Sequence, residues 1–306
     1  SGFCVAGCYT IIESWLQSKV TNETRGRTMA SYRVVDMGAS LMSQLIIGIL
    51  EPASYVSYNL LALLCCATLI PLTLTKVAQP ETPKAPRLRP MLAISRSPLA
   101  AVGVVVAALS GASFRMTGPI FGQQVGLEIT AIAYFLASFV LGGAIAQYPI
   151  GFIADKIDRR WVLIWLSFAA IISCIVTANI TTINIYTLMI TAGFFGFTTF
   201  PIFSVAAAHA HDFAKDYERV ELSAALMFFY AVGAIAAPYT ASVLMESFGP
   251  SALFYLIAFG HAALVIFGFY RMLSRPSVEE KTDYIYSPRT SFLIGRLLKS
   301  HHKDNK

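Results

Sequence analysis

Residues 151–160, GFIADKIDRR, interrupt a long apolar chain with a short cluster of charges. Five of the last six residues in this stretch are Asp, Lys or Arg, and uncharged apolar runs lie on both sides of it. The whole chain is 56% hydrophobic and only 13% charged, with a mean hydropathy of +0.62. Because about a quarter of the residues in soluble domains are charged, this composition indicates a membrane protein.

Long, largely uncharged runs recur along the rest of the chain. A helix needs about 18 to 20 mainly apolar residues to cross roughly 30 Å of hydrocarbon. Runs of this order lie at residues 3–18, 28–50, 55–75, 98–121, 129–150, 161–178, 183–206, 222–245 and 251–273. The sequence therefore predicts an all-α, multi-pass membrane helical bundle with nine transmembrane helices.

Lys and Arg are distributed unevenly between the connections of these helices. Of the 23 basic residues, 21 lie in residues 19–27, 76–97, 155–160, 207–221 and the tail from 271 onward. None lies in the alternate connections, at residues 51–54, 122–128, 179–182 and 246–250. Because cytoplasmic loops retain positive charge, we expect the basic connections and the C-terminus in the cytoplasm. The net charge of +6 then reflects orientation in the membrane and attraction to anionic lipid, rather than binding of nucleic acid.

The first predicted span runs inward from the external side, and neither an initiator Met nor a targeting signal precedes it. We therefore expect Ser1 to lie within a longer protein. The polar stretch at residues 76–97 contains four prolines with basic residues between them, which favours an extended cytoplasmic linker over a helix. The predicted domains are the last three helices of an N-terminal bundle (1–75), this linker, a C-terminal six-helix bundle (98–273) and a cytoplasmic tail (274–306).

The three helices before the linker show a weak repeat of the last three helices after it. At a fixed offset of 195 residues five identities occur, and they include Glu23 with Glu218, Gly38 with Gly233 and Glu51 with Glu246. Both copies also place a charged loop before the middle helix and a short Glu-bearing turn after it. This order is expected for parallel repeats about an axis along the membrane normal.

The charged stretch at 151–160 resembles the G-x-L-a-D-r-x-G-r-k loop motif of the major facilitator superfamily. The matching residues are Gly151, Ala154, Asp155, Lys156, Arg159 and Arg160, while Asp158 replaces the usual glycine. Four further segments, ESWL at 13–16, RGR at 25–27, AQYPIG at 146–151 and GFTTFP at 196–201, resemble the YcaD-type bacterial subgroup. The resemblance implies twelve helices in two six-helix bundles, of which this chain supplies helices four to twelve, in a bacterial cytoplasmic (inner) membrane.

Asp155 is the first candidate functional residue. A carboxylate at one helix end can accept hydrogen bonds from the N–H groups that begin a neighbouring helix. The resemblance implies that its partner is the start of the fifth helix in the opposite bundle, near Gly26, with Arg25, Arg27 and Arg159 close enough to pair. Gly151, Asp155, Arg159, Arg160, Arg25 and Arg27 would then form a latch between the two bundles. The alternative is that these charges only retain the loop on the cytoplasmic side.

Four charged residues lie deep inside predicted spans, away from the span ends: Glu13, Arg33, Asp36 and Arg115. At about 1.5 Å per residue, the first three lie roughly 8 to 12 Å deep from the cytoplasmic helix ends, so their side chains can meet. They form either a structural ion cluster or a proton-coupling site, in which a partly desolvated carboxylate has a raised pKa. Arg115 stands apart, about 26 Å along its helix, where it either holds an anionic substrate group or lines an outer vestibule.

His209, His211 and Asp212 have a spacing that could suit metal ligands, but we expect solvated side chains in an internal loop and no metal site. No cofactor is expected, and no nucleotide motif or nucleophile constellation points to an enzyme. The sequence predicts a monomeric secondary transporter that moves a small solute by alternating access and is coupled to protons. The alternative is a non-transporting membrane receptor or scaffold on the same fold.

Overall fold

The computed structural model describes residues 35–46, 50, 54–74, 89–180, 184–215 and 218–274, and all regular elements in these ranges are helices. Residues 35–46 are helical. The labelled helices are α3 (Tyr55–Leu74), α4 (Pro90–Arg96), α5 (Pro98–Gln124), α6 (Ile129–Lys156), α7 (Arg159–Ala178), α8 (Ile185–His211), α9 (Arg219–Phe248) and α10 (Ala252–Ser274). Within the described residues, six helices, α5 to α10, are long and apolar enough to span a membrane. The prediction of an all-α, multi-pass membrane bundle is confirmed, while the span at 3–18 lies outside the described residues.

The membrane-spanning helices begin and end close to the predicted apolar runs, with one systematic difference. Helices α6 and α8 continue past the apolar runs to Lys156 and His211, so that Asp155 and His209 are helical instead of lying in loops as predicted. The physical reason is that apolarity ends where the hydrocarbon ends, whereas backbone hydrogen bonds continue the helix into water. The connection between α6 and α7 is thereby reduced to residues 157–158.

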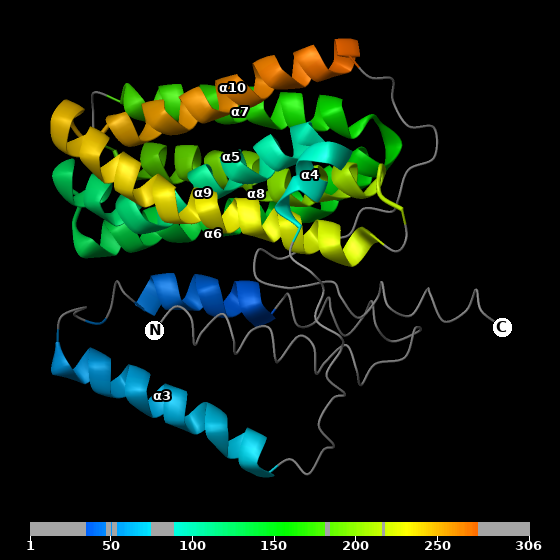
Figure 1. Ribbon diagram of the computed structural model, residues 1–306. Coiled ribbons are helices and arrows are strands. Elements are labelled where there is room, and N and C mark those ends of the chain that lie inside the picture. Colours follow the sequence, from blue (N-terminus) through cyan, green and yellow to red (C-terminus); the bar gives the residue numbers. More distant parts are fainter. Residues whose placement is uncertain are drawn as a thin grey trace.

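Helices α5 to α10 form one bundle of roughly aligned rods, in which α7 and α10 lie side by side along one edge (Figure 1). The most extensive contacts join α6 to α8 and α5 to α9. When α5, α6 and α7 are matched in order with α8, α9 and α10, α6 corresponds to α9 and α5 corresponds to α8. The α6–α8 contact then corresponds to the α9–α5 contact. This correspondence is the contact pattern expected for two three-helix repeats that pack against one another.

Two glycines explain why α6 and α8 pack so closely. A Cβ atom on Gly142 of α6 would overlap the carbonyl oxygen of Gly193, and one on Gly196 of α8 would overlap the carbonyl oxygen of Phe139. Small residues let membrane helices approach until their backbones touch, which increases the dispersion contacts that hold them together in lipid. The two glycines thus account for the extensive contact between α6 and α8.

The predicted extended linker is partly wrong, because Pro90–Arg96 form the short helix α4. Pro90 is in the first turn, where its fixed φ angle suits a helix and its missing N–H is not needed. The helix packs against α9. Arg96 pairs with Glu218 at 2.6 Å and Arg89 pairs with Glu221 at 3.2 Å, so two ion pairs hold the end of the linker on the bundle.

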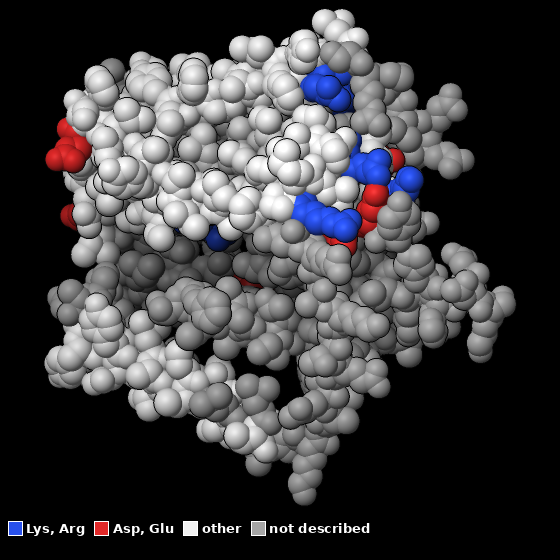
Figure 2. Space-filling view, viewed as in Figure 1, with Lys and Arg blue, Asp and Glu red and all other residues white. Residues whose placement is uncertain are grey.

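Charges gather at one end of the bundle, where α6, α8 and α10 end and α5, α7 and α9 begin; we call it the basic end. Figure 2 shows Lys and Arg side chains grouped there among acidic partners, and acidic side chains at the opposite end. At the opposite end, the described charged residues are Glu128, which precedes the start of α6, and Glu246, in the last turn of α9. The charged groups that can take part in function therefore lie mainly at the basic end and within the membrane-spanning helices.

Candidate functional site

Arg159 is the centre of an ion-pair network at the basic end. It is the first residue of α7 and its side chain is only 1% exposed. Its guanidinium donates to Asp212 at 2.5 Å, to Asp155 at 3.2 Å and to the carbonyl oxygen of Ala208 at 3.1 Å. Asp155 lies on the last turn of α6, and Asp212 and Ala208 lie at the end of α8. One buried cation therefore ties together the ends of three helices.

Asp158, which occupies the position of the usual glycine, caps α7. Its backbone has φ −59°, a value open to any residue, so the turn does not require glycine. Its carboxylate accepts from the backbone N–H of Arg160 at 3.0 Å and from the Arg160 guanidinium at 2.6 Å and 3.0 Å. A carboxylate at this position satisfies an N–H group at the helix start and meets the helix dipole favourably.

The pKa values of two carboxyl groups at the basic end are lowered by arginines. Burial alone would raise the pKa of Asp158, but the hydrogen bonds and charge of Arg160 outweigh it and lower the pKa below its usual 3.8. The hydrogen bond from Arg96 lowers the pKa of Glu218 below 4.5, although burial opposes it. Both groups are therefore ionised at neutral pH, and their ion pairs are present there.

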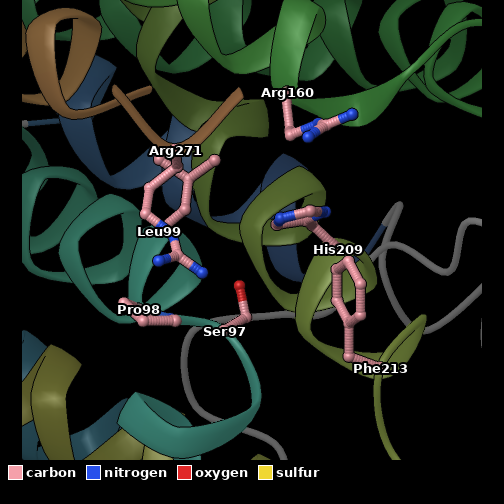
Figure 3. Close-up of a pocket in the computed structure, with 7 residues that line it drawn as sticks. All are labelled: Ser97, Pro98, Leu99, Arg160, His209, Phe213 and Arg271. Carbon is pink, nitrogen blue, oxygen red and sulfur yellow. The ribbon is translucent and has the colours of Figure 1, made fainter. Parts of the chain in front are cut away.

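A small recess lies between the helix ends next to this network (Figure 3). Its walls are Ser97, Pro98 and Leu99 at the start of α5, Arg160 of α7, His209 and Phe213 at the end of α8, and Arg271 of α10. The space between them is about 240 Å³, including the part that is open to solvent. Figure 3 shows Arg271 reaching past Leu99 toward Ser97 and His209.

Arg115 is a charged residue well inside a membrane-spanning helix. It lies 17 residues beyond Pro98, about 25 Å along α5, but helix side chains lean toward the N-terminus. Its guanidinium accordingly lies over the ring of Phe200 in α8, 5.8 Å from the ring centroid. Phe200 is 11 residues before His211, so by the same rise the guanidinium is roughly 17 Å from the basic end. This depth is near the middle of a hydrocarbon core about 30 Å thick.

Phe200 is itself fixed by its neighbours. Its ring lies against Gly143 of α6, where a Cβ would overlap it, and 4.9 Å from the ring of Phe139. Gln147, one turn after Gly143, donates to the carbonyl oxygen of Gly143 at 3.3 Å, and its own amide oxygen is buried with no hydrogen-bond partner. Arg115 and Phe200 thus form a cation–aromatic pair at mid-span, and Gln147 is a further polar side chain within the span of α6.

The structure brings together only some of the residues predicted from sequence. Asp155, Arg159 and Arg160 meet at the basic end, and Gly151 is buried in α6 one turn before Asp155. Asp36 lies in the helical residues 35–46 and is partly buried. Glu13, Arg33, Arg25 and Arg27 lie outside the described residues, so their contacts with Asp36 and Asp155 stay predictions.

Asp212 is the residue that sequence reasoning placed wrongly. Together with His209 and His211 it was expected in a solvated loop, but its side chain is only 5% exposed and pairs with Arg159. His209 is also buried, with its ring against Phe213. Arg159 and Asp212 are 53 residues apart in the sequence. The sequence indicated only that each of them lies beside the cytoplasmic end of an apolar run, which does not predict that they pair.

Comparison with known proteins gives a consistent result. The model of the Major Facilitator Superfamily matches residues 100–302 of this chain. An uncharacterized MFS-type transporter of Enterobacter sp. (strain 638) is 26% identical over 289 residues, which are 94% of this chain and 73% of the relative. The uncharacterized MFS-type transporter YcaD of Salmonella heidelberg is 28% identical over 266 residues, which are 84% of this chain and 67% of the relative. YcaD of an Escherichia coli strain is equally similar.

Proposed function

This chain belongs to the major facilitator superfamily, and we propose that it moves a small solute across the bacterial cytoplasmic membrane by alternating access between two helical bundles. The family and the named relatives support membrane transport. The charge pattern supports an orientation with the basic end and the C-terminus in the cytoplasm. The proposal adds that residues 98–273 are one of the bundles and that residues 1–75 belong to the other.

The observation that carries the proposal is the guanidinium of Arg115 at mid-span. A charged side chain near the bilayer centre costs about 2.5 to 3.5 kcal/mol on insertion scales, so such residues face a partner or a water-filled cavity. Arg115 is exposed on the surface of α5 and lies over Phe200. A cation held over an aromatic ring suits a solute that carries a carboxylate or another anionic group. In this proposal Arg115 binds the solute inside the central cavity.

The Arg159 network supports a second part of the proposal, a latch on the cytoplasmic side. Arg159 holds Asp155 at 3.2 Å, while the Asp155 side chain remains 46% exposed on the last turn of α6. In the proposed latch this carboxylate accepts hydrogen bonds from Gly26, Arg25 and Arg27 of the other bundle. Breaking and forming this contact would accompany closing and opening of the cavity toward the cytoplasm.

Proton coupling is the third part, and it rests on Glu13, Arg33 and Asp36. A carboxylate beside an arginine in a partly desolvated site can release and rebind a proton as its access to solvent alternates. Asp36 is partly buried in residues 35–46, as such a role requires. Solute and proton would then share the cavity that Arg115 faces.

Flux through the full-length protein in proteoliposomes tests these proposals. We expect that an imposed pH gradient drives accumulation of at least one member of a radiolabelled panel of small organic acids, sugars and amines. Arg115→Gln and Asp36→Asn should abolish this flux, whereas Arg89→Gln, which alters an exposed ion pair outside the span, should leave it intact. Solute binding without any flux would instead support a receptor or scaffold and would overturn the transport mechanism.

A further inference from the structure

The recess between α5, α7, α8 and α10 contains an arginine that pairs with none of the carboxylates in the described part of the chain. Arg271, near the end of α10, makes no hydrogen bond or ion pair with any residue that the structure describes. Two acidic residues at the same end of the bundle are bound by other arginines: Asp158 by Arg160 at 2.6 Å and Asp212 by Arg159 at 2.5 Å. Arg271 is therefore the cation of the recess whose charge the described residues leave uncompensated.

The surroundings of Arg271 add to the positive potential of the recess. The side chain reaches toward the first turn of α5, where Ser97 is the N-cap and Pro98 begins the helix (Figure 3). A helix N-terminus carries partial positive charge and exposed N–H donors. The buried imidazole of His209 lines the same recess. Three groups that favour an anion thus line one space; His209 and Arg160 also interact with Asp158, whereas Arg271 bonds to no described acidic residue.

The surface beside the recess has the character of a membrane interface. Trp161 of α7 lies 5.9 Å from Phe269 of α10 and 6.4 Å from Trp165, measured between ring centroids. All three rings are exposed on the bundle, Trp165 by 61%. Trp161 follows Arg160 directly, and Phe269 precedes Arg271 by two residues. Aromatic side chains gather where lipid headgroups meet acyl chains, so the recess opens at headgroup depth beside a surface suited to lipid.

From this arrangement we propose that the recess binds the phosphate group of an anionic membrane lipid, with Arg271 as its main ligand. His209 and the first turn of α5 complete the phosphate site, and Trp161 and Phe269 contact the glycerol and upper acyl region. The bound lipid links the end of α10 to the start of α5 and the end of α8. This site is independent of the transported solute, and it would exist whether or not the chain carries that solute by the proposed mechanism.

Lipid titration of the full-length protein tests the proposal. The protein is placed in phosphatidylcholine nanodiscs with increasing fractions of phosphatidylglycerol, and the midpoint of thermal unfolding is recorded. We expect phosphatidylglycerol to raise the midpoint of the wild type in a saturable way. In Arg271→Gln one charge-assisted hydrogen bond to the lipid phosphate is lost. We therefore expect the apparent affinity of this variant for phosphatidylglycerol to be roughly tenfold to hundredfold weaker than that of the wild type.

Three comparisons make the result decisive. Arg89→Gln removes the same charge from the same end of the bundle, where Arg89 is 57% exposed, and it should keep the wild-type affinity. Arg271→Lys retains the charge and should retain part of the affinity, which separates loss of a ligand from loss of folding. Equal weakening by Arg271→Gln and Arg89→Gln would show only general surface attraction and overturn the site. Equal stabilisation by inorganic phosphate without phosphatidylglycerol would overturn the assignment to lipid.

Discussion

Replacing Arg159 with Met would leave Asp212 as a buried carboxylate without its cation. The Asp212 side chain is 5% exposed and Arg159 is 1% exposed, so water cannot replace the lost 2.5 Å bond. Removing one partner of a buried pair destabilises a protein by about 3 to 5 kcal/mol. The lost bond to the Ala208 carbonyl adds about 1 kcal/mol, while the half-exposed Asp155 contributes about 0 to 1 kcal/mol. We therefore expect Arg159→Met to lower the free energy of unfolding by about 4 kcal/mol.

The assay is equilibrium unfolding of the full-length protein in mixed detergent micelles, with sodium dodecyl sulfate as the denaturant. Asp212→Asn and the double variant Arg159→Met with Asp212→Asn complete a double-mutant cycle. Because the two residues are in direct contact, their coupling free energy should be about 1 to 3 kcal/mol. Arg89→Gln serves as the control, since its exposed ion pair should contribute less than about 1 kcal/mol.

Two results would refute this reasoning. A loss below about 1 kcal/mol in Arg159→Met would mean that the arginine is solvated like a surface residue. Additive effects of Arg159→Met and Asp212→Asn would mean that the two side chains do not interact in the folded protein.

Three further outcomes are expected from other parts of the molecule. Gly142→Ala should lower the free energy of unfolding by about 1 to 3 kcal/mol through overlap at the α6–α8 contact, whereas Gly193→Ala, whose Cβ would have its nearest neighbour at 3.5 Å, should be neutral. The lowered pKa values of Asp158 and Glu218 predict that their ion pairs stabilise the protein fully above about pH 4.5. This stabilisation should disappear as the pH falls through the lowered values, and Glu218→Gln should reduce the pH dependence of the unfolding midpoint. Arg115→Lys keeps the charge but loses the planar guanidinium, so solute flux should show a higher KM than in the wild type.

The helices were predictable from sequence because crossing a lipid bilayer imposes length and apolarity on each span. The charge pattern likewise separated the two ends of the bundle, since the Lys and Arg residues of the connections lie on one side only. The length of an apolar run is a local property, and the charge pattern needs only a count of Lys and Arg in each connection. They need no knowledge of which helix packs against which.

The ion pairs at the basic end were not predictable for the opposite reason. Arg159 and Asp212 are 53 residues apart, and Arg96 and Glu218 are 122 residues apart, so only the tertiary packing brings them together. The short helix α4 was missed because prolines were counted as helix breakers, although Pro90 stands in the first turn, where proline is favourable. Asp158 was known only as a departure from a motif, and its role as the cap of α7 became visible from its bonds to Arg160.

The residues proposed to bind solute and protons were predicted from the energetic penalty of charge in lipid. That argument identifies Arg115 and Asp36 as unusual residues but does not give their neighbours. The contact of Arg115 with Phe200 followed from the register of α5 against α8, which apolarity alone does not determine.

The threading of the chain across the membrane underlies the latch, the lipid site and the transport proposal alike, and cysteine accessibility tests it most directly. Lys156 and Gln123 are both exposed, at the basic and opposite ends of the bundle. Each is replaced singly by Cys in a background without native cysteines and treated with a membrane-impermeant maleimide on intact cells. The predicted result is that Gln123→Cys reacts at once, while Lys156→Cys reacts only after the membrane is permeabilised. Reaction of both positions from outside the intact cell would contradict the account.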